Sequence, residues 1–392
     1  ESSDGQRCDV INPATGGVVS SIAWATTSDV DAAVAAAREA FEKGEWSRLS
    51  GRERSRILMK VSQLIRENSD ELAYAESVDV GKPITFANIV DVNTAADQYE
   101  YVASLAQHLD GATRETPLPA FAFTRREPLG VVGAITPFNF PLILSSSKIA
   151  PALAAGNTVV HKPASDTPLT ALIMADIFTK AGVPAGVVNV ITGSGSALGD
   201  HLVSHPGVNK IAFTGSTEVG QHVASLAGQT LKPITAELGG NAANIVFADA
   251  DLEQAIGAVI SAFVFNTGQF CMGGPRLLVE RPVYETVLGI LAQAVPGVPF
   301  GDPLNPETVI GPLASQNQFD KVSGIVSGAI ARGAKVVTGG QPVDLNGGFY
   351  FQPTVLADLA HEDVAVCEET FGPVLTVQVF DTEEEAIRLA ND

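Results

Sequence analysis

Three side chains of reactive type lie in short segments rich in Gly or Pro: Cys271 in NTGQFCMGG, Glu237 in TAELGGN and Asn139 in ITPFNFPL. A Cys among glycines leaves its sulfur accessible for attack on an electrophile. A Glu between apolar residues can act as a general base, because burial raises the pKa of a carboxyl. A rigidly held amide can donate to a developing oxyanion. Each also has a simpler interpretation: a structural Cys, a capping or ion-paired surface Glu, and an Asn that closes its own turn.

The elements that must position these residues alternate between strands and helices from Pro128 onward. The predicted strands are LGVVGAI, NTVVHK, VVNVITG, KIAFTGS and ITAELGG, and helices are predicted at 142–155 and 168–181. This alternation predicts βαβ units and a parallel sheet covered on both faces. Ligands bind at the carboxyl ends of the strands in such sheets. Several of the unusual residue clusters follow these strand ends.

Helices are also predicted at 28–41, with Ser28 and Asp31 as a capping box, and at 51–68. The second half repeats the alternation, with helices at 251–266, 283–294 and 315–332 and strands RLLVE, KVVTGG, FYFQPTV and GPVLTVQVF. FAFTRREP, at 121–128, alternates apolar and polar residues and is interpreted as an exposed strand or hairpin arm.

Two segments have features of phosphate binding. FTGSTEVG ends a strand and opens a helix, and N–H groups at a helix N-terminus bind phosphate. GSGSALG does not fit the dinucleotide fingerprint G-x-G-x-x-G, because Leu198 stands where the third Gly should be.

Composition excludes several classes of protein. The net charge of −20 argues against a nucleic-acid partner and against anionic membrane surfaces. The cysteines Cys8, Cys271 and Cys367 are too widely spaced for metal-ligand pairs, so no metal site is predicted. The chain shows no signal peptide and no apolar run of about 18 residues, so a cytoplasmic location without membrane association is expected.

The motifs ITPFNFP, KPAS, FTGSTEVG, ELGGN, GQFC and EETFGPV together resemble the aldehyde dehydrogenase superfamily, in its order and over nearly the whole chain. The resemblance implies an NAD(P)-dependent, non-acylating enzyme that oxidises an aldehyde to the acid. Cys271 would be the nucleophile that forms a thiohemiacetal and then a thioester. Asn139 and the Cys271 backbone N–H would form the oxyanion hole, and Glu237 would activate the hydrolytic water.

The resemblance also implies a set of cofactor contacts. Lys162 would bind the adenosine ribose, Ser216 and the adjacent helix start the pyrophosphate, and Glu369 the nicotinamide ribose, with Phe371 beside it. Gln318 and Lys321 resemble further ribose contacts. The remaining positions assigned to the cofactor site are Thr136, Pro137, Phe138, Ala164, Ser165, Gly195, Phe213, Gly215, Val219 and Leu238.

One departure from the family pattern concerns the choice of cofactor. Many NAD-specific members have Glu three residues after the lysine, where this chain has Ser165. Without that carboxylate, a 2′-phosphate is not repelled and can meet Lys162. We therefore expect NADP to be accepted beside NAD, with preference left open, although a carboxylate turned inward at Asp166 would restore the repulsion.

The resemblance implies an α/β fold with a Rossmann-like cofactor domain, a second α/β catalytic domain and a small β oligomerisation arm. The predicted ranges are 1–108 and 129–239 for the dinucleotide-binding domain, 109–128 for the arm and 240–392 for the catalytic domain. Family members usually continue beyond EEEAIRLAND, so the catalytic domain is interpreted as truncated. A homodimer or homotetramer is expected.

Three alternatives stay open at this stage. A CoA-acylating semialdehyde dehydrogenase would transfer the acyl group to a thiol, but that branch generally lacks the residue equivalent to Glu237. A truncated, inactive homologue would bind nucleotide or have a structural role. A thiol hydrolase would need a histidine in a protease-like context, and none of the six is in one. By analogy Phe138, Leu142, Phe265, Phe270 and Met272 line an apolar pocket for an uncharged aldehyde, and Arg276 faces the following strand rather than the substrate.

Overall fold

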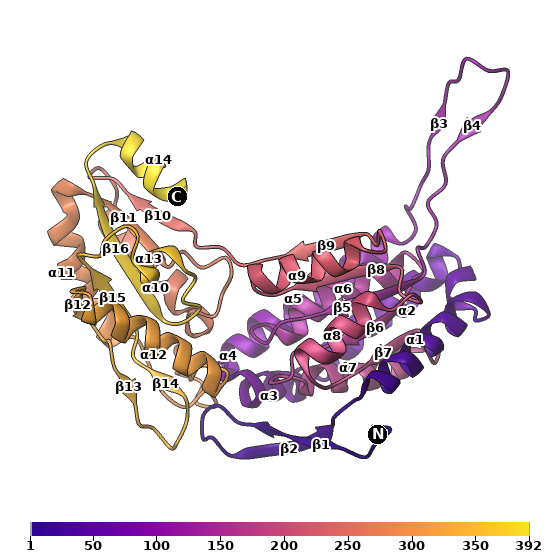
Figure 1. The fold of residues 1–392 in the computed structure, drawn as a ribbon, viewed down its shortest axis with the longest axis horizontal. Coiled ribbons are helices and arrows are strands. Elements are labelled where there is room, and N and C mark those ends of the chain that lie inside the picture. Colours follow the sequence, from indigo (N-terminus) through magenta and orange to yellow (C-terminus); the bar gives the residue numbers. More distant parts are fainter. Residues whose placement is uncertain (1, 392) are drawn as a thin grey trace. The chain divides into compact units, whose positions relative to one another are not determined.

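The computed structural model describes residues 2–391, and its elements form two compact units (Figure 1). Unit 1 comprises the residues up to Val10, Ser20–Glu76 and Phe86–Glu237, and unit 2 comprises Ile11–Val19, Ser77–Thr85 and the residues from Leu238 onward. Residues 1 and 392, which end two of the predicted domain ranges, lie outside the described residues. The assignment of cofactor binding to one domain and catalysis to the other stays a prediction.

A parallel five-stranded sheet forms the centre of unit 1 within the described residues. Its order is β7-β6-β5-β8-β9, and each neighbouring pair runs parallel. The strands are β5 (Val131–Ile135), β6 (Thr158–Lys162), β7 (Val188–Val190), β8 (Lys210–Thr214) and β9 (Ile234–Glu237). All five come from the runs that the sequence predicts as strands.

Helices cover both faces of this sheet (Figure 1). On one face, α1 (Thr27–Glu42), α8 (Gly195–Ser204) and α9 (Thr217–Gly228) share a core with the strands, in which Val34, Leu202 and Val223 meet Ile211. Against the strands also lie α6 (Pro141–Ala154) and α7 (Leu169–Ala181), with α2 (Gly51–Glu67) and α5 (Asn93–Leu105) packed on them. The α7 helix ends at Gly182, whose φ of 90° suits glycine.

The capping box of α1 lies two residues before the predicted one. Thr26, not Ser28, accepts from the backbone N–H of Asp29, and the Asp29 carboxylate accepts from the N–H of Thr26. Both candidate pairs have the same spacing, so the sequence pattern alone does not distinguish them.

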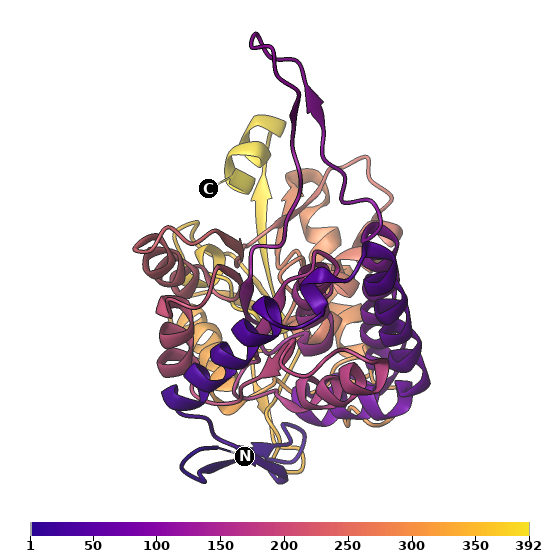
Figure 2. The same cartoon turned by 90° about the vertical axis from the view of Figure 1, so that its right-hand side faces the viewer.

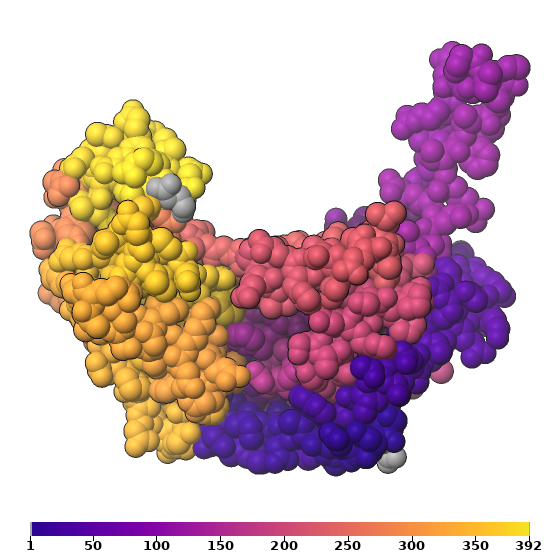
Figure 3. Space-filling model, viewed as in Figure 1, coloured from indigo at the N-terminus to yellow at the C-terminus, as the bar shows by residue number. Residues whose placement is uncertain are grey.

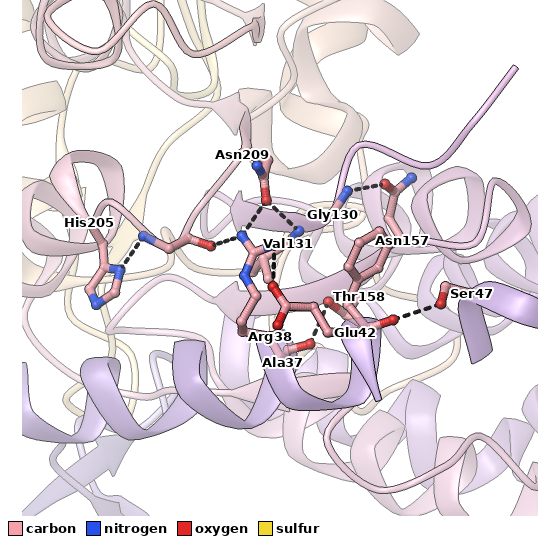
Figure 4. Close-up of polar contacts among 12 residues, drawn as sticks. Ala37, Arg38, Glu42, Ser47, Gly130, Val131, Asn157, Thr158, His205 and Asn209 are labelled. Carbon is pink, nitrogen blue, oxygen red and sulfur yellow. Dashed lines mark hydrogen bonds and ion pairs between the residues drawn. The ribbon is translucent and has the colours of Figure 1, made fainter. Parts of the chain in front are cut away.

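A polar network joins α1 to the amino-terminal edge of the sheet (Figure 4). The Arg38 guanidinium donates to the Gly207 carbonyl at 2.6 Å and to Asn209 Oδ1 at 2.5 Å. Asn209 Oδ1 also accepts from the buried Val131 N–H at 3.0 Å, at the start of β5. The Gly207 N–H donates to His205 Nδ1 at 2.9 Å. Asn209 therefore links a helix, a strand and the segment that enters β8.

The predicted arm projects from the rest of unit 1 (Figures 2 and 3). It holds β3 (Thr113–Arg114) and β4 (Ala122–Phe123), which pair antiparallel. Leu118, Phe121 and Phe123 are 68%, 79% and 64% exposed. The ordered pairing is shorter than the predicted FAFTRREP strand, because β4 ends at Phe123.

Unit 2 has its own five-stranded sheet in the described part of the chain, in the order β10-β11-β16-β15-β12. Its strands β10 (Ala243–Val246), β11 (Arg276–Glu280), β16 (Val374–Phe380) and β15 (Thr354–Ala357) are parallel, whereas β12 (Lys335–Thr338) pairs antiparallel with β15. The principal helices are α10 (Leu252–Val264), α11 (Tyr284–Ala294), α12 (Gln316–Ala331) and α14 (Glu383–Asn391).

The prediction of one strand across FYFQPTV is wrong. The segment divides into β14 (Tyr350–Phe351), which pairs with β13 (Pro342–Val343), and β15, which joins the main sheet. Pro353 lies between them and has no N–H to donate to a ladder, which favours a break there.

The remaining elements were not predicted from the sequence. They are β1 (Arg7–Ile11), β2 (Val18–Ala23), α3 (Ser69–Val80), α4 (Ile84–Phe86), the π-helix η2 (Ala87–Val92), α13 (Val364–Cys367) and the 3₁₀ turns η1 (Trp46–Arg48), η3 (Phe265–Gly268), η4 (Arg281–Val283) and η5 (Val295–Gly297). Across residues 2–391, every helix is too short or too polar to cross a membrane.

We expect Asn209→Ala to lower the free energy of unfolding by about 2 kcal/mol, because the buried Val131 N–H loses its acceptor and the Arg38 guanidinium loses one acceptor while keeping the Gly207 carbonyl. Chemical denaturation with a far-UV signal measures this change. Gln221→Ala on the exposed face of α9 is the control and should change it by less than about 0.5 kcal/mol. Equal stabilities of the two variants would contradict the role of the network.

Candidate functional site

The carboxyl end of β6 places Lys162 inside unit 1. Lys162 is 2% exposed and donates to the Pro163 carbonyl at 2.8 Å. Burial lowers the pKa of Lys162 to about 8, and nearby Asp166 opposes this shift. The Ser165 hydroxyl donates to the Gly193 carbonyl at 2.8 Å, and Asp166 is exposed. A buried ammonium at a strand end can bind a ribose hydroxyl or a phosphate, since it has three donors.

The segment after β8 opens α9 in a way that suits a phosphate. Ser216 is the N-cap, and its hydroxyl accepts from the Val219 N–H at 3.4 Å. Gly215 has no room for a side chain, because a Cβ there would lie 2.6 Å from the Phe213 ring. Positions 216–219 are exposed, so a ligand can reach the N–H groups of the first turn. These features fit the pyrophosphate contact predicted for Ser216.

The turn after β5 holds the predicted Thr136 and Asn139 in buried positions, with exposed fractions of 4% and 2%. Thr136 Oγ1 is 3.0 Å from His161 Nε2 on the neighbouring strand. Burial, with the charges of Lys162 and Lys148, lowers the pKa of His161 to about 3. A neutral histidine therefore pairs with Thr136 at physiological pH, and this pair joins the ends of two adjacent strands.

Glu237 ends β9 and is exposed, so the expectation that this carboxylate is buried is wrong for this structure. Its backbone carbonyl accepts from the Gly215 N–H at 3.1 Å, which joins β9 to the segment after β8. The charge of Glu237 acts on Lys148, whose buried ammonium donates to Thr214 Oγ1. Within unit 1, the end of the sheet thus brings together a carboxylate, an ammonium and a hydroxyl.

In unit 2, Cys271 follows the turn η3 and is exposed. A pocket lies beside it, and its lining includes Phe270 and Gly273 on either side of the cysteine. The same pocket is lined by Glu369, Phe371 and Gly372. Unit 2 therefore brings the candidate nucleophile's loop next to two residues predicted to hold the nicotinamide ribose.

Side chains of α12 fasten the segment that holds Glu369. Gln318 donates to the Phe371 carbonyl at 2.7 Å and to the Thr370 carbonyl at 3.3 Å, and Lys321 donates to the Glu369 carbonyl at 2.8 Å. Burial raises the pKa of Glu369, while Lys321 and the Gly240 N–H oppose the shift. These contacts position the backbone of 369–371, a use of Gln318 and Lys321 that the sequence did not predict.

The other positions assigned to the cofactor lie in unit 1, except Leu238, which is the first residue of the last segment of unit 2. Pro137, Phe138 and Ala164 are half-buried in the segments after β5 and β6, and Gly195 is the exposed first residue of α8. Val219 and Leu238 are 48% and 38% exposed.

The predicted substrate lining needs one correction. Leu142 is fully buried in unit 1, where its N–H donates to Glu76 Oε1 at 2.9 Å, so it cannot contact a substrate. In unit 2, Phe265 and Phe270 pack edge to face with ring centroids 5.1 Å apart, and Met272 is 76% exposed. Arg276 is buried and donates to the carbonyls of Asn241 and Leu389, so its guanidinium is engaged within unit 2.

Sequence reasoning missed Lys148. The only signal was a lysine within the apolar run LILSSSKIAPALA of α6, where a charge has no hydrophobic reason to be. Burial lowers the pKa of Lys148 to about 8, although Glu237 opposes the shift. Such a perturbed group at the end of a sheet is a candidate member of a functional site.

The lowered pKa of Lys148 predicts a pH dependence of stability. Between pH 8 and 10.5 the unfolded chain binds this proton more tightly than the folded chain, so the free energy of unfolding rises with pH over that interval. Lys148→Met should reduce this rise by about 1–3 kcal/mol, measured by denaturation at pH 8 and above 10. Lys180→Met, at an exposed lysine of α7, is the control for losing one positive charge. Equal pH dependence in wild type and Lys148→Met would contradict the prediction.

Comparison with known proteins identifies the family of the chain. The sequence model of the aldehyde dehydrogenase family matches residues 1–392. An aldehyde dehydrogenase from Bacillus cereus, solved as an NAD⁺ complex, is 40% identical with a TM-score of 0.98, over 100% of this chain and 80% of that one. An NAD-dependent aldehyde dehydrogenase from Sinorhizobium meliloti is 41% identical with a TM-score of 0.97, over 100% and 78%.

A betaine aldehyde dehydrogenase from Staphylococcus aureus, in complex with NAD⁺, is 36% identical with a TM-score of 0.97, over 100% of this chain and 79% of that one. These structures share the Rossmann-like and catalytic α/β architecture. The chain belongs to the aldehyde dehydrogenase family, whose members oxidise aldehydes to carboxylic acids with NAD.

Proposed function

We propose that this enzyme oxidises an uncharged aldehyde through a thioester on Cys271. The observation that carries the proposal is the exposed Cys271 thiol in the loop whose Phe270 and Gly273 line one pocket together with Glu369 and Phe371. The betaine aldehyde dehydrogenase of Staphylococcus aureus supports a reactive cysteine, because its NAD⁺ complex contains a BME-modified cysteine.

In the first half of the reaction, the Cys271 thiolate attacks the aldehyde carbon and forms a thiohemiacetal. The Asn139 amide and the Cys271 backbone N–H donate to the resulting oxyanion. Collapse of this intermediate expels a hydride from the carbon and leaves a thioester. Bound NAD supplies the acceptor for that hydride.

In the second half, Glu237 takes a proton from a water molecule that attacks the thioester carbon. The acid leaves and the Cys271 sulfur departs as a thiolate, which restores the nucleophile. The exposure of Glu237 supports this role, because an exposed carboxylate has access to water. The buried ammonium of Lys148 is close enough for the charge of Glu237 to raise the pKa of this lysine.

The cofactor contacts are also part of the proposal. Lys162 binds the adenosine ribose, the first turn of α9 from Ser216 binds the pyrophosphate, and Glu369 accepts from the nicotinamide ribose. The residues present fit such a group, since the buried ammonium of Lys162 ends β6 and the exposed N-terminus of α9 follows β8, and these two strands flank β5. This division makes unit 1 the cofactor-binding unit and unit 2 the catalytic one.

NADP is accepted beside NAD in this proposal. No carboxylate stands at Ser165, and the Ser165 hydroxyl proton is directed to the Gly193 carbonyl. A 2′-phosphate would therefore make its charged contact with the Lys162 ammonium. The same ammonium is also attracted by the Asp166 carboxylate. Asp166 is exposed rather than buried beside Ser165, which limits its repulsion of a phosphate.

The apolar character of the Cys271 surroundings supports an uncharged substrate. Phe265, Phe270 and the exposed Met272 offer aromatic and aliphatic surface, and the Arg276 guanidinium is engaged by backbone carbonyls. A dicarboxylic semialdehyde would need a cationic anchor. We also propose a homodimer or homotetramer, in which the exposed apolar arm pairs with another copy. A cytoplasmic location remains a prediction from the sequence.

We expect Cys271→Ala to abolish NADH formation from aldehyde, with a loss of at least about 10³-fold, because the thioester cannot form. Glu237→Gln should keep the first turnover, seen as a burst of NADH, while its steady-state rate falls by about 10²–10⁴-fold. Stopped-flow absorbance at 340 nm separates the two phases. Cys367→Ala, at a second exposed cysteine whose Sγ donates to the His361 carbonyl, is the control and should keep full activity.

Three outcomes would contradict the proposal. Full activity of Cys271→Ala would exclude the thioester route. Turnover that requires added CoA and yields an acyl-CoA would favour the acylating alternative, in which a thiol replaces the water activated by Glu237. A complete lack of aldehyde-dependent NADH from the wild type would favour an inactive nucleotide-binding homologue.

We expect the wild type to use both NAD and NADP, and Ser165→Glu to lower kcat/KM for NADP by about 10- to 100-fold through like-charge repulsion. The value for NAD should change by less than about threefold. Ser165→Gln has the same bulk without the charge and is the control. Steady-state kinetics with both cofactors measures the ratio, and a wild type that uses NAD alone would contradict the prediction.

A further inference from the structure

The turn that leads to Cys271 has an unfavourable backbone conformation. Asn266, Thr267 and Gly268 have φ values of 50°, 57° and 73°, so three successive residues lie in the left-handed region. Gly and, less readily, Asn tolerate this region, but a β-branched residue such as Thr rarely occupies it. A conformation of this kind persists only where surrounding contacts hold it.

Buried polar contacts provide that restraint, and Gln269 makes two of them. Its Nε2 donates to the Asn266 carbonyl at 3.2 Å, and its Oε1 accepts from the Ala314 N–H at 3.0 Å. Asn266 Nδ2 returns a bond to the Gln269 carbonyl at 3.1 Å. The Gln269 carboxamide therefore closes the turn on itself and ties it to a segment 45 residues further along the chain.

Two further contacts hold the turn 266–268 against other segments of unit 2. Thr267 Oγ1 donates to the Gly311 carbonyl at 3.2 Å. At Gly268, a Cβ would lie 2.0 Å from the Gly372 carbonyl oxygen, so the turn packs directly on the segment that carries Glu369 and Phe371. Asn266, Thr267 and Gln269 are each 1% exposed, so water does not compete for these bonds.

We infer that Gln269 is a positioning residue for Cys271: its carboxamide locks the left-handed turn 266–268 and so fixes the sulfur at the pocket with Glu369. This inference rests on the proposed role of Cys271. Cys271 is two residues from Gln269, and the chain between them leaves little freedom once Gln269 is clamped. Without the carboxamide, the Ala314 N–H loses this acceptor and the buried Asn266 carbonyl loses one of its donors while keeping the Gln269 backbone N–H, and the turn relaxes toward right-handed backbone.

Gln269→Met removes both hydrogen bonds at similar side-chain length. We expect kcat for aldehyde oxidation to fall at least tenfold. The rate constant for alkylation of Cys271 by iodoacetamide, measured with Cys8 and Cys367 replaced by Ser, should change at least threefold. Gln378→Met is the matched control, because Gln378 is also a buried glutamine of unit 2 and contacts His361 rather than the turn. Both of its rates should stay within twofold of wild type.

Gln269→Glu separates positioning from a general loss of structure. When protonated, the introduced carboxyl donates to the Asn266 carbonyl and accepts from the Ala314 N–H, as the amide does. When ionised, the carboxylate has no proton to donate, and its oxygen faces the Asn266 carbonyl oxygen, so two acceptors repel each other. Burial raises the pKa of the introduced carboxyl, so activity relative to wild type should recover as pH falls and decline as pH rises. Gln269→Met should show no such recovery.

The outcomes distinguish the inference from the proposed function. If kcat and the alkylation rate of Gln269→Met stay within twofold of wild type, or change no more than in Gln378→Met, the positioning role is wrong. If Gln269→Glu shows no pH-dependent recovery, the lock by hydrogen bonding is wrong. If Cys271→Ala keeps full activity, the thioester mechanism is wrong, whereas the alkylation rates still test whether Gln269 fixes the sulfur.

Discussion

Parallel strands cannot be joined by tight hairpins, so after each strand the chain must cross a face of the sheet before the next strand begins. In unit 1, α6, α7, α8 and α9 make these crossings, and all five strands end at one edge. Register makes the consequence specific: Ile135 lies beside Lys162 and Phe213, and Thr214 lies beside Glu237. Lys162, the turn after β8 and Glu237 therefore lie at the same edge of the sheet, because the strands that carry them are parallel.

In unit 2 the candidate pocket lies at the amino-terminal edge of the parallel strands rather than at their carboxyl-terminal edge. The residues that line the pocket precede strands rather than follow them: Gly240 comes before β10, Pro275 before β11 and Gly372 before β16. The rule that ligands bind at carboxyl ends does not predict this placement. The pocket forms because three loops converge where parallel strands begin, and a glycine in each of them lets the backbones approach closely.

The sequence predicted the secondary structure of the strand–helix alternation well, because apolar runs and helical periodicity are local properties. It did less well where an outcome depends on distant partners. Leu142 and Lys148 lie on the same helix, yet which faces of α6 are buried depends on strands and helices elsewhere. Glu237 was expected to be buried because its neighbours in sequence are apolar, but β9 is an edge strand and leaves it exposed. Burial is a property of the sheet's order, which residue patterns do not specify.

The turn before Cys271 shows the same limit at the scale of a single motif. The unfavourable φ values of Asn266 and Thr267 are local, but the contacts that offset them come from Gly311, Ala314 and Gly372. NTGQFC predicts an accessible cysteine because glycine permits it; accessibility alone does not place a sulfur at a fixed point. A reactive atom needs both an open approach and a restrained backbone. Gln269 provides the restraint without covering the thiol, since the hydrogen bonds of its side-chain carboxamide are buried.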